Sequence, residues 1–142
     1  MDEMDRSLTF LMHRIVTRVE AAMNKRAHPL GLSVEGVRIL IRLAAKDYQT
    51  VGDLARQTNI ERSTLSRALA RMEREGVVRK KRLPADNRAV AISLTPKGRA
   101  LAKTQLPTFR EYERLVLRGI TLKKVDAFKA ALIAMHRNAT TL

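Results

Sequence analysis

Residues 76–98 of the 142-residue chain read GVVRKKRLPADNRAVAISLTPKG, and this stretch decides the fold. Residues 89–94 alternate between small and larger apolar side chains, which is the two-residue period of a strand. The Pro-Ala-Asp-Asn run at 84–87 has strong turn composition. The stretch therefore predicts a β-hairpin with strands at 77–83 and 88–94 and a polar, basic tip.

Two helical segments joined by a short break precede the hairpin. Thr50 is placed to cap the first segment, and Asp53 follows three residues later as in a capping box. The second segment runs over about 62–75 and ends at Gly76, where a glycine can take a left-handed conformation. With a break at 58–60 between them, the two segments predict a helix-turn-helix, whose second helix lies in the major groove of DNA.

Helical periodicity flanks this unit on both sides. We expect one helix over about 5–26, one beginning after a cap at Ser33, one over about 96–118 and one from Thr121 onward. Pro107 should kink or split the helix in which it lies. The expected fold class is mainly α with a small β-hairpin wing: a winged helix-turn-helix with N- and C-terminal dimerisation helices.

The terminal helices carry more apolar face than one small helical unit can bury. A two-fold dimer supplies the missing surface and sets two recognition helices about 34–36 Å apart, one turn of the duplex. The alternative is that these helices pack only on their own subunit. We expect one integrated domain with a dimerisation helix at 1–31, a DNA-binding region at 32–98 and dimerisation helices at 99–142. The expected interface residues are Leu8, Met12, Ile15, Val19, Phe128, Leu132 and Met135.

The chain is strongly basic, with 28 Lys and Arg against 14 Asp and Glu, a net charge of +14. Such a field attracts polyanions. Between Thr50 and Ala100, 12 Lys and Arg stand against 5 Asp and Glu, so half of the net charge, +7, lies in this third of the chain. A membrane-binding surface would place Trp or Phe beside the basic residues, and this region has neither. The charge therefore favours a nucleic acid as partner.

The second helix of the helix-turn-helix carries a polar, basic face opposite its apolar stripe. Arginine can bond two acceptors on guanine, and hydroxyl groups contact bases or phosphates. The alternative is that the arginines of this helix, and the cations of the hairpin, are simply solvated. The candidate DNA-binding residues are Arg62, Ser63, Thr64, Ser66, Arg67 and Arg71 on the helix, and Arg79, Lys80, Lys81, Arg82, Asn87 and Arg88 on the hairpin.

Four segments together resemble the multiple-antibiotic-resistance regulator (MarR) family. Residues 86–98 resemble its wing signature, which has an aspartate and an arginine two apart, then a leucine-threonine pair and a glycine three residues later. Residues 51–55 resemble the brace helix of the family, 63–69 its recognition helix and 71–78 the junction into the wing. Their order and spacing match, and the terminal helices match in kind, so the resemblance spans nearly the whole chain.

The resemblance implies a homodimer whose terminal helices interlock across a two-fold axis. It implies that the recognition helix enters the major groove, that Arg88 reaches the adjacent minor groove and that Asp86 orients Arg88. It further implies a repressor that binds a palindromic operator in double-stranded DNA and is released by a small aromatic or phenolic effector, whose binding residues stay unassigned. The expected location is the cytoplasm, in association with the nucleoid. A weakly specific architectural DNA-binding protein and a partner-binding adaptor are the alternatives.

Other chemistries find little support in the sequence. The chain has no cysteine, which excludes disulfides, thiolate metal sites and cysteine nucleophiles. The histidines are scattered, and no metal-binding or phosphate-loop motif is present. No apolar run approaches the ~18 residues of a membrane helix, and the acidic start does not resemble a secretory signal. We therefore expect no enzyme, no metal and no cofactor.

Overall fold

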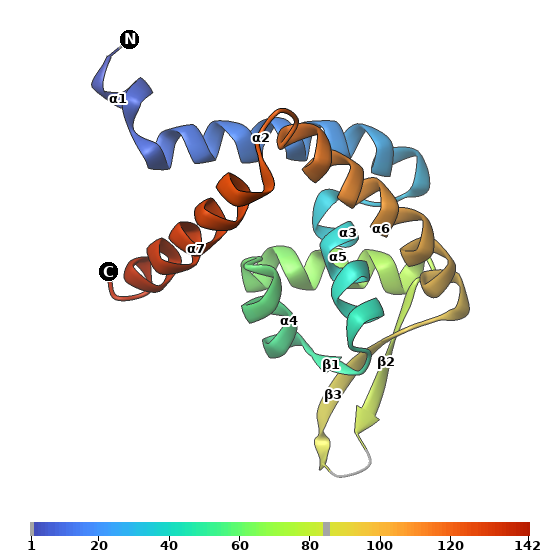
Figure 1. The fold of residues 1–142 in the computed structure, drawn as a ribbon. Helices are drawn as coiled ribbons and strands as arrows, with labels where there is room; N and C mark the ends of the chain where they lie inside the picture. Colours follow the sequence, from blue (N-terminus) through green and yellow to red (C-terminus); the bar gives the residue numbers. More distant parts are fainter. Residues whose placement is uncertain (1, 84–85) are drawn as a thin grey trace. The chain divides into compact units, whose positions relative to one another are not determined.

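The computed structural model describes residues 2–83 and 86–142, and Figure 1 shows their path. It is mainly helical with one small antiparallel sheet, as the sequence predicts. The chain divides into two compact units, with the boundary after Phe109. No helix in the described part is long and apolar enough to cross a membrane. The elements are α1 (Glu3–Arg6), α2 (Leu8–Ala27), a 3-10 turn (His28–Leu30), α3 (Val34–Ala45), β1 (Gln49–Thr50), α4 (Val51–Thr58), α5 (Arg62–Arg74), β2 (Val78–Leu83), β3 (Asp86–Leu94), α6 (Pro96–Val116) and α7 (Leu122–Ala139).

The first helical region is interrupted at Ser7, so the single helix expected over 5–26 is wrong at its start. The side chain of Asp2 accepts a hydrogen bond from the backbone N–H of Asp5 and thereby caps α1. Ser7 then takes an extended conformation, with φ −61° and ψ 125°, which ends α1 and precedes α2. A cap on one side and an extended residue on the other thus separate a one-turn helix from the long one.

The predicted ends of the central helices are confirmed. Ser33 caps α3 by accepting from the N–H of Gly36 at 3.1 Å, and Thr50 caps α4 by accepting from the N–H of Asp53 at 3.1 Å. Asn59 ends α4 in the left-handed region at φ 53°, which short polar side chains tolerate, and α5 begins three residues later at Arg62. Gly76 ends the last turn after α5 at φ 71°.

The hairpin is part of a three-stranded sheet in the order β1-β3-β2. The sequence does not predict β1, which pairs with β3 in antiparallel register. Since β3 lies in the centre of the sheet and is covered on both faces, residues 91–94 are all buried. The period of residue types thus predicts the strand correctly, although it does not separate a buried from an exposed face there; Val90 beyond these residues is 39% exposed.

The turn of the hairpin is shorter than expected. Leu83 pairs with Asp86, so β3 begins two residues before the predicted start at 88. Asp86 and Asn87 therefore belong to a strand and not to the turn predicted over 84–87. Pro84 and Ala85 lie outside the described residues.

The helix-turn-helix and the sheet share one hydrophobic core. Leu54 of α4, Leu65 of α5 and Ile92 of β3 are all fully buried. Leu40 of α3 and Leu94 of β3 join them at 0% and 1% exposure. Because burial of side chains of this size typically stabilises by about 1.5–3 kcal/mol each, this core holds α5 and the base of the hairpin in one rigid arrangement.

Helix α6 begins at Pro96 and is capped by Thr95, whose Oγ1 accepts from the N–H of Gly98 at 3.1 Å, as the Thr-Pro pair predicts. Of the kink or split expected at Pro107, the split does not occur, because one continuous helix spans Pro96–Val116. A proline removes only one backbone donor, and the turns on either side of Pro107 remain bonded. There the hydroxyls of Thr104 and Thr108 also donate to carbonyls one turn back, at 2.8 and 3.2 Å.

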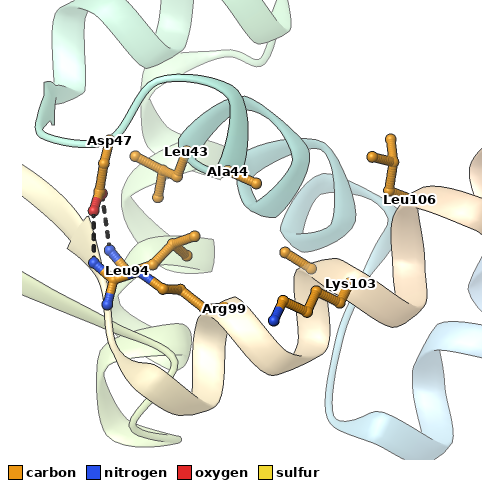
Figure 2. A pocket seen from close by; sticks show the side chains of 8 residues that line it. Leu43, Ala44, Asp47, Leu94, Arg99, Lys103 and Leu106 are labelled. Atoms are coloured by element: carbon orange, nitrogen blue, oxygen red, sulfur yellow. Dashed lines mark hydrogen bonds and ion pairs between the residues drawn. The ribbon is translucent and has the colours of Figure 1, made fainter.

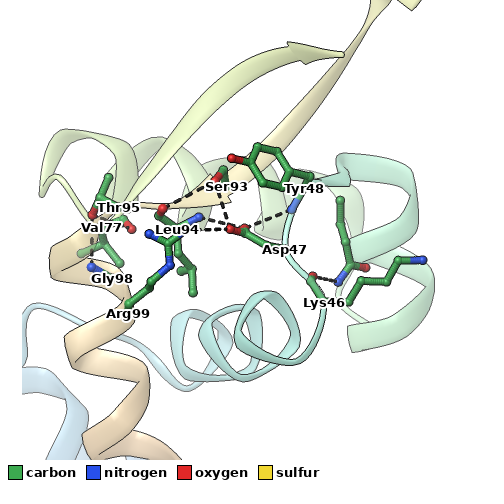
Figure 3. Close-up of polar contacts among 10 residues, drawn as sticks. Lys46, Asp47, Tyr48, Val77, Ser93, Leu94, Thr95, Gly98 and Arg99 are labelled. Atoms are coloured by element: carbon green, nitrogen blue, oxygen red, sulfur yellow. Dashed lines mark hydrogen bonds and ion pairs between the residues drawn. The ribbon is translucent and has the colours of Figure 1, made fainter. Parts of the chain in front are cut away.

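Gly98 lies against the backbone of the residue that enters β2. A Cβ at this position would be 2.1 Å from the carbonyl oxygen of Val77 and 3.1 Å from Cδ2 of Leu94. The same carbonyl accepts from the N–H and from Oγ1 of Thr95, both at 3.1 Å. Figure 3 shows Val77, Thr95 and Gly98 together at the start of α6. The close approach of α6 to the hairpin thus depends on the missing side chain.

Candidate nucleic-acid interface

Helix α5 presents the predicted basic face to solvent. Leu65, Leu69 and Met72 are buried against the core, which fixes the rotation of the helix about its axis. The predicted DNA-binding residues Arg62, Ser63, Ser66, Arg67 and Arg71 are exposed, and Thr64 is half-buried. The structure therefore brings all six onto the accessible part of one helix.

Two hydroxyls on this helix already have partners. Ser63 donates from Oγ to a carboxylate oxygen of Glu61 at 2.9 Å, and Arg67 donates from Nη2 to Oγ1 of Thr64 at 3.4 Å. Glu61 lies at the N-cap position without a capping bond of its own. A base or phosphate that bonded Ser63 or Arg67 would therefore replace these contacts.

Strand β2 supplies the second basic surface. Arg79, Lys80, Lys81 and Arg82 are all exposed along one short strand. In the register, Arg79 lies opposite Ser93 and Lys81 opposite Ala91, so these two cations share one face of the sheet. The side chains of Asp86, Asn87 and Arg88 lie outside the described part of the structure, so their predicted roles stay predictions.

The base of the hairpin is joined to its neighbours through Asp47, which sequence reasoning missed. Its Oδ1 accepts from the N–H groups of Leu94 at 3.0 Å and Tyr48 at 3.0 Å. Its Oδ2 accepts from Oγ of Ser93 and Nη2 of Arg99, both at 3.2 Å. Figure 3 shows this convergence. One carboxylate thus links the loop after α3 to the end of β3 and the start of α6.

Tyr48 follows Asp47 in a left-handed conformation at φ 56°, which is uncommon for a bulky residue. Its ring lies beneath the ammonium of Lys81, whose Nζ is 5.5 Å from the ring centroid. The hydroxyl of Ser93 and then the positive charge of Lys81 lower the pKa of the Tyr48 phenol, because both favour its anion. Tyr48 thus contacts the basic face of the hairpin from outside the sheet.

Replacing Lys81 with glutamine should raise the pKa of Tyr48 toward its ordinary value of about 10, since the variant lacks the cation that stabilises the phenolate. Tyrosinate absorbance over a pH series measures this, in a Tyr112→Phe background that leaves one tyrosine. Lys80→Gln is the matched control, because the side chain of Lys80 points to the other face of β2. An equal response to both changes would contradict the contact between Tyr48 and Lys81.

Helix α3 contributes to two cavities of the first compact unit. One, of about 310 Å³, is shown in Figure 2 with Asp47 and Arg99 at its rim. The other, of about 290 Å³, is lined by Arg38 and Arg42 together with the apolar residues Ile41 and Phe109. Within the described residues, no group of three or more His, Asp or Glu side chains is arranged to hold a metal ion.

A helix-turn-helix whose second helix carries an exposed basic face, packed with a basic hairpin on one core, defines a winged helix-turn-helix DNA-binding protein. A sequence profile of the MarR family matches residues 32–90. The crystal structure of a MarR-family transcriptional regulator from Silicibacter pomeroyi is 36% identical and has a TM-score of 0.84, covering 95% of this chain and 91% of its own. The chain belongs to the MarR family of transcriptional regulators, whose members are not enzymes.

Two further comparisons agree. The HTH-type transcriptional repressor Rv2887 of Mycobacterium tuberculosis is 26% identical over 128 residues, which cover 90% of this chain and 92% of the relative. The DNA complex of MepR from Staphylococcus aureus matches with a TM-score of 0.85 at 21% identity, over 94% of this chain and 98% of that one. The second likeness, at this identity, concerns the fold.

Proposed function

We propose that this MarR-family regulator is a homodimeric repressor that recognises a palindromic operator in double-stranded DNA. The observation that carries the proposal is the joint placement of α5 and β2 on one core, with basic side chains exposed on both. Two such subunits related by a two-fold axis would present their recognition helices to successive turns of one duplex face. The repressor among the relatives agrees with this direction of regulation.

The contacts are assigned by chemistry and position. Ser63, Thr64, Ser66 and Arg67 read base edges in the major groove. Phosphates are held by Arg62 and Arg71 and by the cations of β2. Arg88, oriented by Asp86 and beside Asn87, enters the minor groove at the tip of the hairpin.

The exposed apolar residues of the terminal helices support the dimer. Leu8 is 49% and Ile15 47% exposed on α2, and Phe128 is 45% exposed on α7. Met12, Val19, Leu132 and Met135 are half-buried in the single chain. A stripe of this kind on each helix gives a second copy an apolar surface to cover. We assign dimerisation to 1–31 and 99–142, and DNA binding to 32–98, within one integrated domain.

Arg67→Ala should weaken binding to a duplex selected from a random pool by ~1–3 kcal/mol and relax specificity at one base position. Lys80→Ala should instead weaken binding to all DNA sequences alike, since a phosphate contact carries no base information. It should also reduce the slope of log affinity against log salt concentration by about one. Fluorescence anisotropy on the selected duplex and on a scrambled duplex, over a salt series, separates the two effects. Equal wild-type affinity for both duplexes would instead identify a weakly specific architectural protein.

An effector site is proposed at the cavity lined by Arg38 and Arg42. Arg38 is paired with Glu20 of α2, whereas Arg42 is exposed. Two arginines together with the apolar residues Ile41 and Phe109 suit a small aromatic acid. Adding 4-hydroxybenzoate or benzoate to the complex should release the duplex from the wild type and not from an Arg42→Gln variant. Release from both variants alike would place the site elsewhere.

A further inference from the structure

The hairpin projects from the domain, and its direction depends on how its base is held. Beyond the sheet bonds, the Asp47 carboxylate links the end of β3 to the loop after α3. Its side chain is only 22% exposed and accepts four hydrogen bonds, which fills both oxygens. Charge-assisted bonds of this kind are stronger than neutral ones. The link is therefore built to fix an orientation.

The conformation of Tyr48 also supports a fixed orientation of the hairpin. A left-handed tyrosine costs free energy unless surrounding contacts hold it. Here the N–H of Tyr48 bonds the carboxylate of Asp47, and its ring meets Lys81 on β2. The exposed fraction of Tyr48 is 44%, so burial of the ring does not by itself explain the conformation. The outlier places a rigid ring against the basic face of the hairpin.

We propose that Asp47 is a positioning residue for DNA binding, which sets the direction of the hairpin through Ser93, Leu94 and Arg99 and holds Tyr48 as a brace beneath Lys81. Asp47 itself makes no contact with DNA in this proposal. The inference rests on the proposed DNA contacts of the hairpin. It adds a residue outside both basic surfaces that determines how well they reach the duplex together.

The sign of the effect separates this role from simple electrostatics. Removing a carboxylate from a chain of net charge +14 raises its positive charge, which by itself tightens binding to DNA. Loss of positioning instead weakens binding to DNA, because Arg88 and the β2 cations are then displaced from their contacts with the duplex. Asp47→Ala should therefore weaken binding to the selected duplex by about tenfold, the equivalent of about 1.4 kcal/mol. Asp47→Asn, which keeps an acceptor for Leu94 and Tyr48, should fall between Asp47→Ala and the wild type.

Asp53→Asn is the matched control. It removes the same charge nearby, on the first turn of α4, where Asp53 pairs with Arg56. Its affinity for the selected duplex should be unchanged or slightly higher than that of the wild type. Binding is measured by anisotropy at a temperature where circular dichroism shows every variant fully folded, so that loss of fold does not enter the comparison.

A double-mutant cycle identifies the element through which Asp47 acts. Combined with Arg88→Ala, the Asp47→Ala change should cost less than it does alone, since one of the contacts that Asp47 positions, the one in the minor groove, is already gone. When Asp47→Ala is combined with Arg67→Ala, the fold-losses in affinity of the two single variants should multiply. Multiplication in both backgrounds, or Asp47→Ala binding as tightly as the wild type, would overturn the inference. A wild type that fails to bind any duplex would instead overturn the proposed function, so the two failures are distinguishable.

Discussion

Replacing Gly98 with alanine should destabilise the folded chain by about 3 kcal/mol or more, at the upper end of what overpacking costs. The added Cβ would lie 2.1 Å from the carbonyl oxygen of Val77, a backbone atom that cannot rotate away. To relieve this contact, α6 must move from the hairpin. That movement also breaks the two bonds from Thr95 to the same carbonyl. Urea unfolding followed by circular dichroism measures the loss.

Gly52→Ala is the control for this change. A Cβ at Gly52 would meet the ends of two flexible side chains, Nη2 of Arg62 at 3.3 Å and Nη1 of Arg56 at 3.7 Å. Those groups can move at little cost, and alanine is the better helix former, so Gly52→Ala should be neutral or stabilise by up to about 1 kcal/mol. If Gly98→Ala were as stable as Gly52→Ala, the close packing of α6 on the entry to β2 would be wrong.

Phe128→Glu should abolish the dimer and reduce affinity for a palindromic duplex by roughly 10²–10⁴-fold. The subunit itself should stay folded, because the side chain is already 45% exposed in the single chain. A charge at that position cannot be covered by an apolar partner surface without a large desolvation cost. A lone subunit then engages one half-site and loses the gain of two linked contacts. Sedimentation velocity gives the oligomeric state, and anisotropy gives the affinity.

Phe128→Leu serves as the companion variant, since it keeps the position apolar at a smaller volume. It should remain dimeric and retain most of its affinity. A Phe128→Glu protein that still sedimented as a dimer would remove α7 from the interface. A monomeric Phe128→Glu protein that bound the palindrome as tightly as the wild type would contradict the need for two subunits.

The elements with strong local signals were the ones that the sequence could predict. Caps at Ser33, Thr50 and Thr95 are formed by side-chain hydrogen bonds that depend on one residue type at one position. The left-handed glycine at Gly76 and the basic face of α5 have the same local origin. The α6 helix passes Pro107 because a long helix that is bonded on both sides tolerates one missing donor.

What the sequence could not predict depends on contacts between distant segments. Strand β1 has two residues, Gln49 and Thr50, too few to show any period. Its pairing makes β3 central, which is why Ser93 is buried although small polar residues usually face solvent. The role of Asp47 arises only when Arg99, 52 residues later, comes within 3.2 Å of it. A left-handed Tyr48 has no composition signal, since glycine or asparagine is the usual choice there.

The shared core described above has a genetic consequence. Leu65 on the back of the recognition helix and Ile92 at the root of the hairpin lie in the same packed interior. A substitution at either position would therefore displace both the recognition helix and the hairpin, although neither side chain is among the proposed DNA contacts. A genetic screen for variants of the protein that no longer bind the proposed operator should therefore recover substitutions in the core as well as substitutions of the exposed arginines. Second-site substitutions that restore DNA binding to the core variants should restore the side-chain volume of the core. They should not change the net charge of the protein.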